Sequence, residues 1–154
     1  MILQFCPKKI SIEEATKDGI KLNFDQMNNG EKRYRLVGPD GSGYCRTLGS
    51  NKGAWQNSHY HKAATEIYIV QSGWIIYGEI DHSKNCKLNY LKEGQSVTVL
   101  PFVHHNVFMS PNSVVHTVKC GKTDRGADWF PSEELDEYTK SFSEEDLFKL
   151  FVKI

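Results

Sequence analysis

Residues 53–73 read GAWQNSHYHKAATEIYIVQSG, and this stretch decides both the fold and the chemistry expected of the chain. Two histidines and one glutamate, His59, His61 and Glu66, lie between Gly53 and Gly73. On a β-strand, residues two apart point to the same face and lie about 7 Å apart, so the two imidazoles can converge on one ion. A carboxylate at the head of an apolar strand is costly to bury unless it is paired or bound to a metal. This donor set suits a divalent transition metal.

A second segment, GQSVTVLPFVHHN at residues 94–106, adds to this pattern. An apolar strand leads to Pro101, which should end the strand or lie at its edge. The adjacent histidines His104 and His105 follow. If this segment is extended, the two side chains point to opposite faces, so only one of them can face an interior site.

The middle of the chain, from about residue 33 to residue 120, is built from short β segments separated by turns. Aromatic and β-branched residues are frequent in the segments, and Gly, Asn, Pro, Asp and Ser are frequent between them. Many short strands at this spacing predict an all-β sandwich or barrel. The predicted strands are RYRLV, YCRTL, TEIYIV, WIIYGEI, KLNYL, SVTVL, NVFM and VVHTVK.

The C-terminal segment, from about residue 131 to residue 153, has a helical pattern instead. Ser132 is a candidate N-cap, and the pair Ser143 and Asp146 resembles a capping box. Leucine and phenylalanine recur at Leu147, Leu150 and Phe151, which gives one apolar stripe. The stripe either packs on the sheet or meets a second subunit.

The length and charge of the chain exclude several classes of protein. Its 154 residues match one ordinary domain, so we expect a single domain over residues 1–154. Nineteen basic residues balance nineteen acidic ones without a basic block, which argues against nucleic-acid binding. No apolar stretch reaches the roughly 18 residues that span a bilayer, so we expect no membrane association. The N-terminus lacks the basic-then-apolar order of a signal peptide, which predicts a cytoplasmic protein.

The four cysteines, Cys6, Cys45, Cys86 and Cys120, are far apart in the sequence, so they form no CxxC motif. In a reducing compartment we expect buried or partly buried thiols. Alternatively one of them lines the pocket, and Cys45 and Cys120 are the better candidates because both lie in predicted strands.

Together, these two segments give the chain a resemblance to the cupin superfamily, small metal-binding proteins built as a double-stranded β-helix or jelly-roll barrel. The first cupin motif, Gly-x5-His-x-His-x3,4-Glu-x6-Gly, matches residues 53–73 at every fixed position. The second motif matches less well: Gly94 is present, but Gln95 replaces the usual Asp, and Phe102 lies where a glycine is expected. Met109 replaces its final Asn.

The resemblance implies a metal site made of three histidines and one glutamate. Counting the motif from Gly94 selects His105 over His104, so the implied ligands are His59, His61, Glu66 and His105. The implied cofactor is one divalent transition metal, iron, manganese, zinc or nickel. The resemblance also implies a homodimer. The expected fold is therefore an all-β cupin barrel followed by short C-terminal helices.

Other residues are candidates for shaping the pocket. Alternation along VVHTVKC puts His116 on the apolar face, which we expect to point inward. There it could support a metal ligand, shuttle a proton or simply pack in the core. Tyr68 should share a face with Glu66, and Tyr77 should share one with Glu79, so these three side chains, Tyr68, Tyr77 and Glu79, are candidate acids or bases.

Two further side chains have positions that the sequence leaves open. An inward Arg46, which shares a face with Tyr44, would favour a carboxylate or phosphate substrate, whereas an outward one would be ordinary surface. His82 lies in a predicted turn and should be exposed.

Two functions follow as hypotheses. The first is a metal-dependent enzyme acting on a small molecule, of the isomerase, dioxygenase, decarboxylase or lyase type. The alternative is a non-catalytic protein that binds or senses a small, sugar-like ligand.

Overall fold

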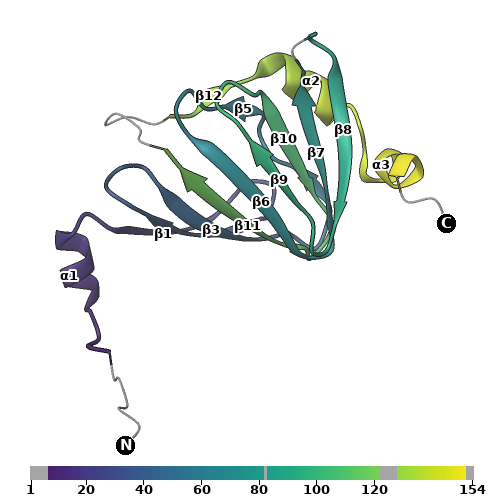
Figure 1. The fold of residues 1–154 in the computed structure, drawn as a ribbon. Helices are drawn as coiled ribbons and strands as arrows, with labels where there is room; N and C mark the ends of the chain where they lie inside the picture. Colours follow the sequence, from purple (N-terminus) through teal and green to yellow (C-terminus); the bar gives the residue numbers. More distant parts are fainter. Residues whose placement is uncertain (1–6, 82, 122–127, 152–154) are drawn as a thin grey trace, which may run out of the picture.

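The fold consists of two antiparallel β-sheets that face each other, with three short helices outside them (Figure 1). The computed structural model describes residues 7–81, 83–121 and 128–151. The first sheet has the strand order β1 (Lys21–Gln26), β2 (Lys32–Val37), β3 (Gly43–Leu48), β11 (Val114–Cys120), β6 (Thr65–Ser72) and β9 (Ser96–Val99). The second has the order β12 (Phe130–Pro131), β5 (His59–Tyr60), β10 (His105–Met109), β7 (Trp74–Ile80) and β8 (Cys86–Lys92), and β4 (Ala54–Trp55) pairs with β10.

All eight predicted strands are confirmed within a residue or two of their predicted ends. The sequence prediction missed two N-terminal elements, strand β1 and helix α1 (Ile12–Lys17). Strand β1, KLNFDQ, has little apolar content, and all six of its residues are exposed. Its pairing with β2 therefore rests on main-chain hydrogen bonds and cross-strand contacts rather than on burial in the core.

The two C-terminal helices, α2 (Glu133–Lys140) and α3 (Glu144–Phe151), lie beside the second sheet, away from α1 (Figure 1). The capping box of α3 is confirmed, because Ser143 and Asp146 exchange hydrogen bonds between side chain and backbone N–H. Ser132 is the N-cap of α2 as predicted, but its side chain makes no capping hydrogen bond. Of the two interpretations of the apolar stripe, packing on the sheet is correct for Leu147, which is fully buried against the second sheet.

The main core lies between the sheets and draws on both of them. It contains Tyr68, Val70, Ile75, Tyr77, Leu91, Val99, Val107, Met109 and Val115. A second core of Ile76, Phe108 and Leu147 lies between the second sheet and α3. Burying a side chain of this size contributes about 1.5–3 kcal/mol, so α3 is an integral part of the fold.

Each of the two glycines of the first motif is required for a different structural reason. A Cβ atom on Gly53 would overlap the ring of Phe108. Gly73, at the turn from β6 to β7, has φ +77°, a backbone conformation that residues other than glycine rarely adopt. A side chain is therefore disfavoured at both positions, for a steric reason at Gly53 and a conformational one at Gly73.

Side chains on the first sheet are arranged in rows that cross its strands. Register places Tyr68 of β6 opposite Thr117 of β11, Thr117 opposite Cys45 of β3, and Cys45 opposite Arg35 of β2. Because Tyr68 is buried in the core, this whole row faces inward. Polar side chains thus occupy the inner face near β2, while Tyr34 and Leu36 of that strand face solvent.

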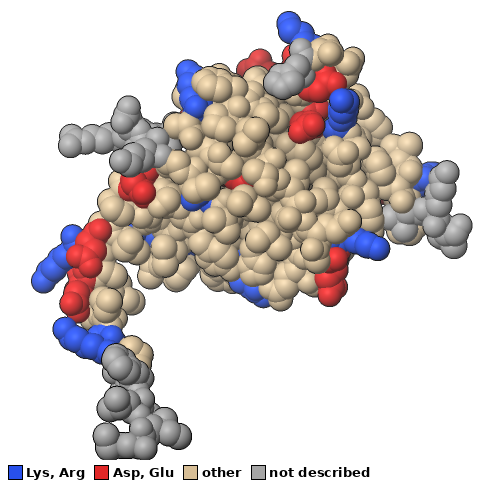
Figure 2. All heavy atoms as spheres, viewed as in Figure 1, with Lys and Arg blue, Asp and Glu red and all other residues tan. Residues whose placement is uncertain are grey.

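On the face shown in Figure 2, lysine and arginine do not gather into one patch. In the part of the chain that the structure describes, every helix is too short or too polar to cross a membrane.

Candidate metal centre

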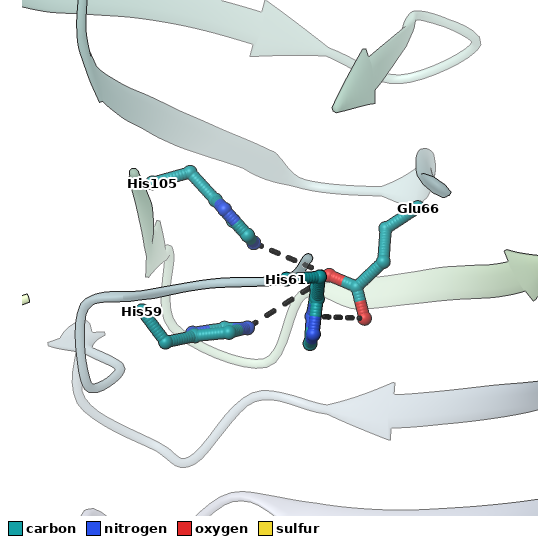
Figure 3. Close-up of side chains that lie close together, drawn as sticks. All are labelled: His59, His61, Glu66 and His105. Carbon is teal, nitrogen blue, oxygen red and sulfur yellow. Dashed lines mark hydrogen bonds and ion pairs between the residues drawn. The ribbon is translucent and has the colours of Figure 1, made fainter. Parts of the chain in front are cut away.

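Four side chains carried by the two sheets point toward one another (Figure 3). His59 comes from β5, His61 follows that strand, Glu66 lies on β6 and His105 begins β10. Their potential ligand atoms all lie within 4.8 Å of one another, and all four residues are buried. The structure therefore brings together the four predicted ligands from both sheets.

Separations between the ligand atoms suit a single first-row metal ion. His61 Nε2 lies 3.2 Å from Glu66 Oε1, and His105 Nε2 lies 3.2 Å from Glu66 Oε2. His59 Nε2 lies 3.9 Å from Glu66 Oε2. Two ligands that each bind one ion at about 2.1 Å lie about 3–4 Å apart. The cluster could therefore hold an ion with only small side-chain movements.

All three imidazoles are oriented by main-chain carbonyl groups. His59 Nδ1 lies 3.0 Å from the carbonyl oxygen of Asn57, and His105 Nδ1 lies 3.0 Å from that of Val103. His61 Nδ1 contacts the carbonyl oxygen of Asp128. A carbonyl only accepts hydrogen bonds, so each Nδ1 carries the proton and each Nε2 turns a lone pair toward the cluster. This arrangement is typical of metal-binding histidines.

Burial and neighbouring charges shift the protonation of the cluster. Burial, and then the proximity of His105, lowers the pKa of His59 to about 3. Burial alone would raise the pKa of Glu66, but the close contacts of its carboxylate with His105 and His61 outweigh burial and hold that pKa well below its usual range. Around neutral pH, His59 is therefore neutral and Glu66 is ionised, which are the forms that bind a metal.

The choice between the two adjacent histidines follows from the strand geometry. His105 is fully buried and joins the cluster. His104 points the other way: its ring stacks on Tyr60 at 4.4 Å between centroids, and its Nδ1 lies 2.8 Å from Ser132 Oγ. This contact also explains why the Ser132 side chain does not cap α2.

His59, His61 and Glu66 of this cluster form one side of a cavity of about 360 Å³. Its other walls carry three cationic side chains, Arg33, Arg35 and Lys119. Trp129 also lines it, with its indole stacked on His59 at 5.3 Å between ring centroids. The cavity therefore combines candidate metal ligands, positive charge and an exposed aromatic face.

Lys119 lies on β11 directly opposite Glu66 of β6. Its Nζ is 3.8 Å from Glu66 Oε1 and 3.4 Å from His61 Nε2. Burial lowers the pKa of Lys119, although the charges of Glu66 and Asp128 oppose this shift. The ammonium group is the cation nearest to the cluster among those for which the structure gives a distance.

The candidate acids and bases occupy two different places. Tyr68 shares a face with Glu66 as predicted; its hydroxyl donates to Glu66 Oε2 at 2.8 Å and lies 3.3 Å from His105 Nε2. Burial and the charge of Glu66 raise the pKa of Tyr68, so it remains a proton donor. Tyr77 and Glu79 also share a face, and the Tyr77 hydroxyl donates to Glu79 Oε2 at 2.9 Å. Of these three candidates, Tyr68 alone lines the cavity.

The prediction that His116 faces inward is wrong. Strand β11 turns Val115, Thr117 and Lys119 inward, which leaves His116 on the outer face. There its Nδ1 lies 2.6 Å from the Tyr44 hydroxyl and its Nε2 lies 2.6 Å from Gln71 Oε1. The apolar neighbours of His116 in the sequence suggested a core face, but the polar residues of this strand are the ones that line the cavity.

Three other expectations have mixed outcomes. Arg46 is on the outer face, where its Nη1 donates to Gln71 Oε1 at 2.7 Å, so it is not part of the cavity. Cys45 lines the cavity, whereas Cys120 is exposed, which contradicts the expectation of a buried or pocket-lining thiol there. His82 and Cys6 lie outside the described residues.

Sequence reasoning missed the arginines and Asp128. In residues 33–36, arginines alternate with Tyr34 and Leu36. Hydrophobic patterning assigns the apolar pair to the inner face, so it places the arginines in solvent. Asp128 reaches the site from a segment with no motif, and its carboxylate accepts hydrogen bonds from three backbone N–H groups at residues 62–64. Only the tertiary structure reveals that contact.

Comparison with solved structures identifies the architecture. KdgF from Halomonas sp. superposes with a TM-score of 0.55 at 17% identity, over 66% of this chain and 88% of that one. The fold is that of a cupin. Oxalate decarboxylase from Bacillus subtilis gives a TM-score of 0.60 at 11% identity, over 87% of this chain and 35% of that one. CapF from Staphylococcus aureus gives a TM-score of 0.57 at 14% identity, over 71% of this chain and 34% of that one.

The chain spans about a third of the oxalate decarboxylase and CapF chains, so its likeness to them concerns one part of each. At these identities the likeness establishes the fold alone. No protein-family model matches the sequence, and no curated protein matches it.

Proposed function

We propose that this cupin binds one divalent transition metal through His59, His61, Glu66 and His105, and that it acts as a metal-dependent enzyme on a small molecule. The observation that carries the proposal is the common orientation of the three imidazoles. Each Nδ1 is occupied by a main-chain carbonyl, so each Nε2 is directed at the same point beside the Glu66 carboxylate. The softness of this donor set favours iron, manganese, zinc or nickel over calcium or magnesium.

A structural role alone does not account for this cluster. Three buried imidazoles and a buried carboxylate are costly to desolvate, and apolar side chains of the same volume would fill the space at a lower cost. The cluster also opens onto a cavity of about 360 Å³, which is within the usual range for small-molecule sites. A binding site for an ion and a small molecule is the simpler explanation.

When bound, the metal supplies a Lewis acid or an activated water at this point. The chain's own residues contribute the surroundings. Tyr68 holds a proton on its hydroxyl beside Glu66 and His105, where it can donate to a reacting oxygen. Trp129 shields one side of the His59 ring, and Lys119 supplies positive charge. These features support an isomerase, dioxygenase, decarboxylase or lyase type of reaction.

Metal content tests the first half of the proposal. Protein purified from medium supplemented with iron, manganese, zinc and nickel should contain close to one equivalent of one of them by mass spectrometry of the metals. Glu66→Gln should lose most of this metal. Glu79→Gln is the matched control, because Glu79 lies opposite His105 on β7 but outside the cluster, and it should retain the metal. A wild-type protein without metal would refute the proposal.

A substrate panel tests the second half. The metal-loaded protein should convert at least one small molecule, and chelation should abolish the conversion. If ligands raise its thermal stability but none is converted, the protein is a non-catalytic binding cupin.

A further inference from the structure

Two arginines of β2 form the wall of the cavity on the first sheet. Arg33 and Arg35 are two residues apart, so they point to the same face. Register places Arg35 opposite Cys45 and Arg33 opposite Thr47, and both of these partners line the cavity. Arginines on the inner face of a barrel are costly to desolvate, which calls for an explanation.

Both guanidinium groups are held in place by carboxylates but keep N–H donors free. Arg33 directs Nε and Nη2 at one oxygen of the fully buried Glu31, at 3.2 and 2.9 Å. Arg35 donates from Nη1 to Asp25 Oδ2 at 2.5 Å. A guanidinium carries five N–H donors, so each arginine retains donors with no acceptor among the described residues. Donors fixed beside an empty volume are suited to a planar carboxylate.

The charge around the cavity depends on the metal. Three cations, Arg33, Arg35 and Lys119, face four carboxylates: Glu66 and Asp128 in the lining, and Glu31 and Asp25 behind the arginines. Three positive and four negative charges leave one negative charge, which repels an anion. A divalent ion reverses this to one positive charge, which matches one carboxylate better than a phosphate dianion.

The remaining wall suits the organic part of a ligand. Trp129 is 43% exposed, and its indole lies flat on His59 at the cavity. An aromatic face of this kind packs against an apolar or ring-shaped surface.

We infer that the ligand of this cavity is a small organic molecule with one carboxylate, which binds through Arg33, Arg35 and Lys119 only after the metal site is filled. This inference rests on the proposed function, because the metal supplies the charge that reverses the sign of the cavity. It assigns Arg35 a role in ligand binding that is separate from metal binding.

The experiment compares matched neutral and anionic probes by titration calorimetry on the full chain. The pairs are benzoate with benzamide and lactate with lactamide, and phenyl phosphate is the dianionic probe. Metal-loaded protein should bind at least one carboxylate tenfold or more tightly than its amide and than phenyl phosphate. Metal-free protein should bind none of the carboxylates measurably.

Arg35→Gln should weaken carboxylate binding about tenfold without changing the metal content or the affinity for the amide. Arg35 is preferred to Arg33 for this test, because loss of Arg33 leaves the buried Glu31 without its ion pair and can prevent folding. Arg46→Gln is the control: it removes an arginine from the outer face of the neighbouring strand and should change nothing.

The outcomes separate the two proposals. Protein that contains no metal refutes the proposed function. Protein with normal metal content that binds no carboxylate, or binds carboxylate and amide equally, refutes this inference alone. Equal carboxylate binding with and without metal refutes the charge reversal, and an unchanged affinity in Arg35→Gln refutes the role of that arginine.

Discussion

His61 and Asp128 are 67 residues apart in the sequence, yet the Nδ1 atom of His61 is bonded to the main-chain carbonyl of Asp128. The carboxylate of the same aspartate accepts hydrogen bonds from the backbone N–H groups of Lys62, Ala63 and Ala64. One residue therefore fixes both the ring of a candidate ligand and the loop that leads from it to Glu66.

Asp128→Ala should weaken metal binding although it removes no ligand. Without the carboxylate, the loop at residues 62–64 loses three acceptors, and the carbonyl that orients His61 loses its anchor. Loss of such a supporting contact typically costs 10- to 100-fold in metal affinity, so we expect at least a tenfold increase in Kd in a competition assay with a fluorescent chelator. Asp146→Ala removes the carboxylate that accepts hydrogen bonds from Ser143 at the start of α3, and it should leave metal affinity unchanged.

The metal-free protein should lose stability as the pH falls from about 6.5 toward about 3. The pKa of His59 is about 3 in the folded chain and 6.5 without the fold, so in this window the unfolded chain binds a proton that the folded chain does not. The stabilisation is complete above pH 6.5 and decreases below it, by at most about 1.4 kcal/mol per pH unit.

Urea denaturation over this pH range measures the slope. His59→Gln should have a shallower slope between pH 6 and 4 than the wild type, because glutamine does not titrate. The lowered pKa of Glu66 adds an acid-labile contribution, but only below its ordinary value of 4.5. Equal slopes for wild type and His59→Gln above pH 4.5 would contradict the prediction.

Phe102→Gly should stabilise the fold. Phe102 is 64% exposed and has φ +65°, a left-handed conformation that favours glycine, and it lies where the second motif is expected to have a glycine. This conformation costs a non-glycine residue about 1–2 kcal/mol, while the greater freedom of glycine in the unfolded chain offsets about 0.5–1 kcal/mol. We expect a net gain of up to about 1.5 kcal/mol, or roughly 3–6 °C in Tm.

The matched comparison for this prediction is Gly94→Ala. Gly94 has φ +82°, and no atom lies within 4 Å of the position that a Cβ methyl group would take, so the substitution adds conformational strain without a clash. It should therefore lower Tm, whereas Phe102→Gly raises it. A fall in Tm for both variants would show that the Phe102 ring makes a stabilising contact.

The protein should form a homodimer through the exposed edge strand β1. Leu22 and Phe24 point outward there and continue an apolar surface onto Tyr34 and Leu36 of β2. Two copies of β1 paired antiparallel about Asn23 would place Lys21 opposite Asp25 and Leu22 opposite Phe24. Such a self-complementary pairing satisfies the edge hydrogen bonds of both copies.

Analytical ultracentrifugation over a dilution series checks this prediction. Phe24→Glu should shift the sedimentation toward a monomer by placing like charges in the contact. Leu150→Glu, which changes another exposed apolar residue, on α3, should have no effect. A monomeric wild type at high concentration would contradict the prediction.

Much of the fold and the four-residue cluster could be predicted from the sequence, because both depend on local spacing. His59 and His61 lie two apart, and their motif fixes the turn after β6 through Gly73. The strands were recognisable because their β-branched and aromatic residues are bounded by turn residues. The choice of His105 over His104 followed from the spacing of the second motif, and the alternation of side chains in an extended segment explains why only one of them joins the site.

The walls of the cavity could not be predicted in the same way. Hydrophobic alternation assigns the apolar face of a strand to the core, and β2 and β11 reverse that rule. Arg33 and Lys119 face inward while Tyr34 and His116 face outward, because this end of the barrel holds a polar cavity instead of packed side chains. Strand β1 was missed for a related reason, since an edge strand without buried residues has no hydrophobic pattern to recognise.

The three carbonyl oxygens that orient the imidazoles belong to the main chain of Asn57, Val103 and Asp128. Every amino acid supplies a carbonyl, so changes of residue type at positions 57 and 103 leave the acceptors in place as long as the backbone keeps its course. The orientation of the candidate metal ligands therefore tolerates substitutions at these two positions, while the arginine wall depends on the identity of its side chains. Selection could then replace one ligand specificity by another on β2 without rebuilding the site between the two sheets.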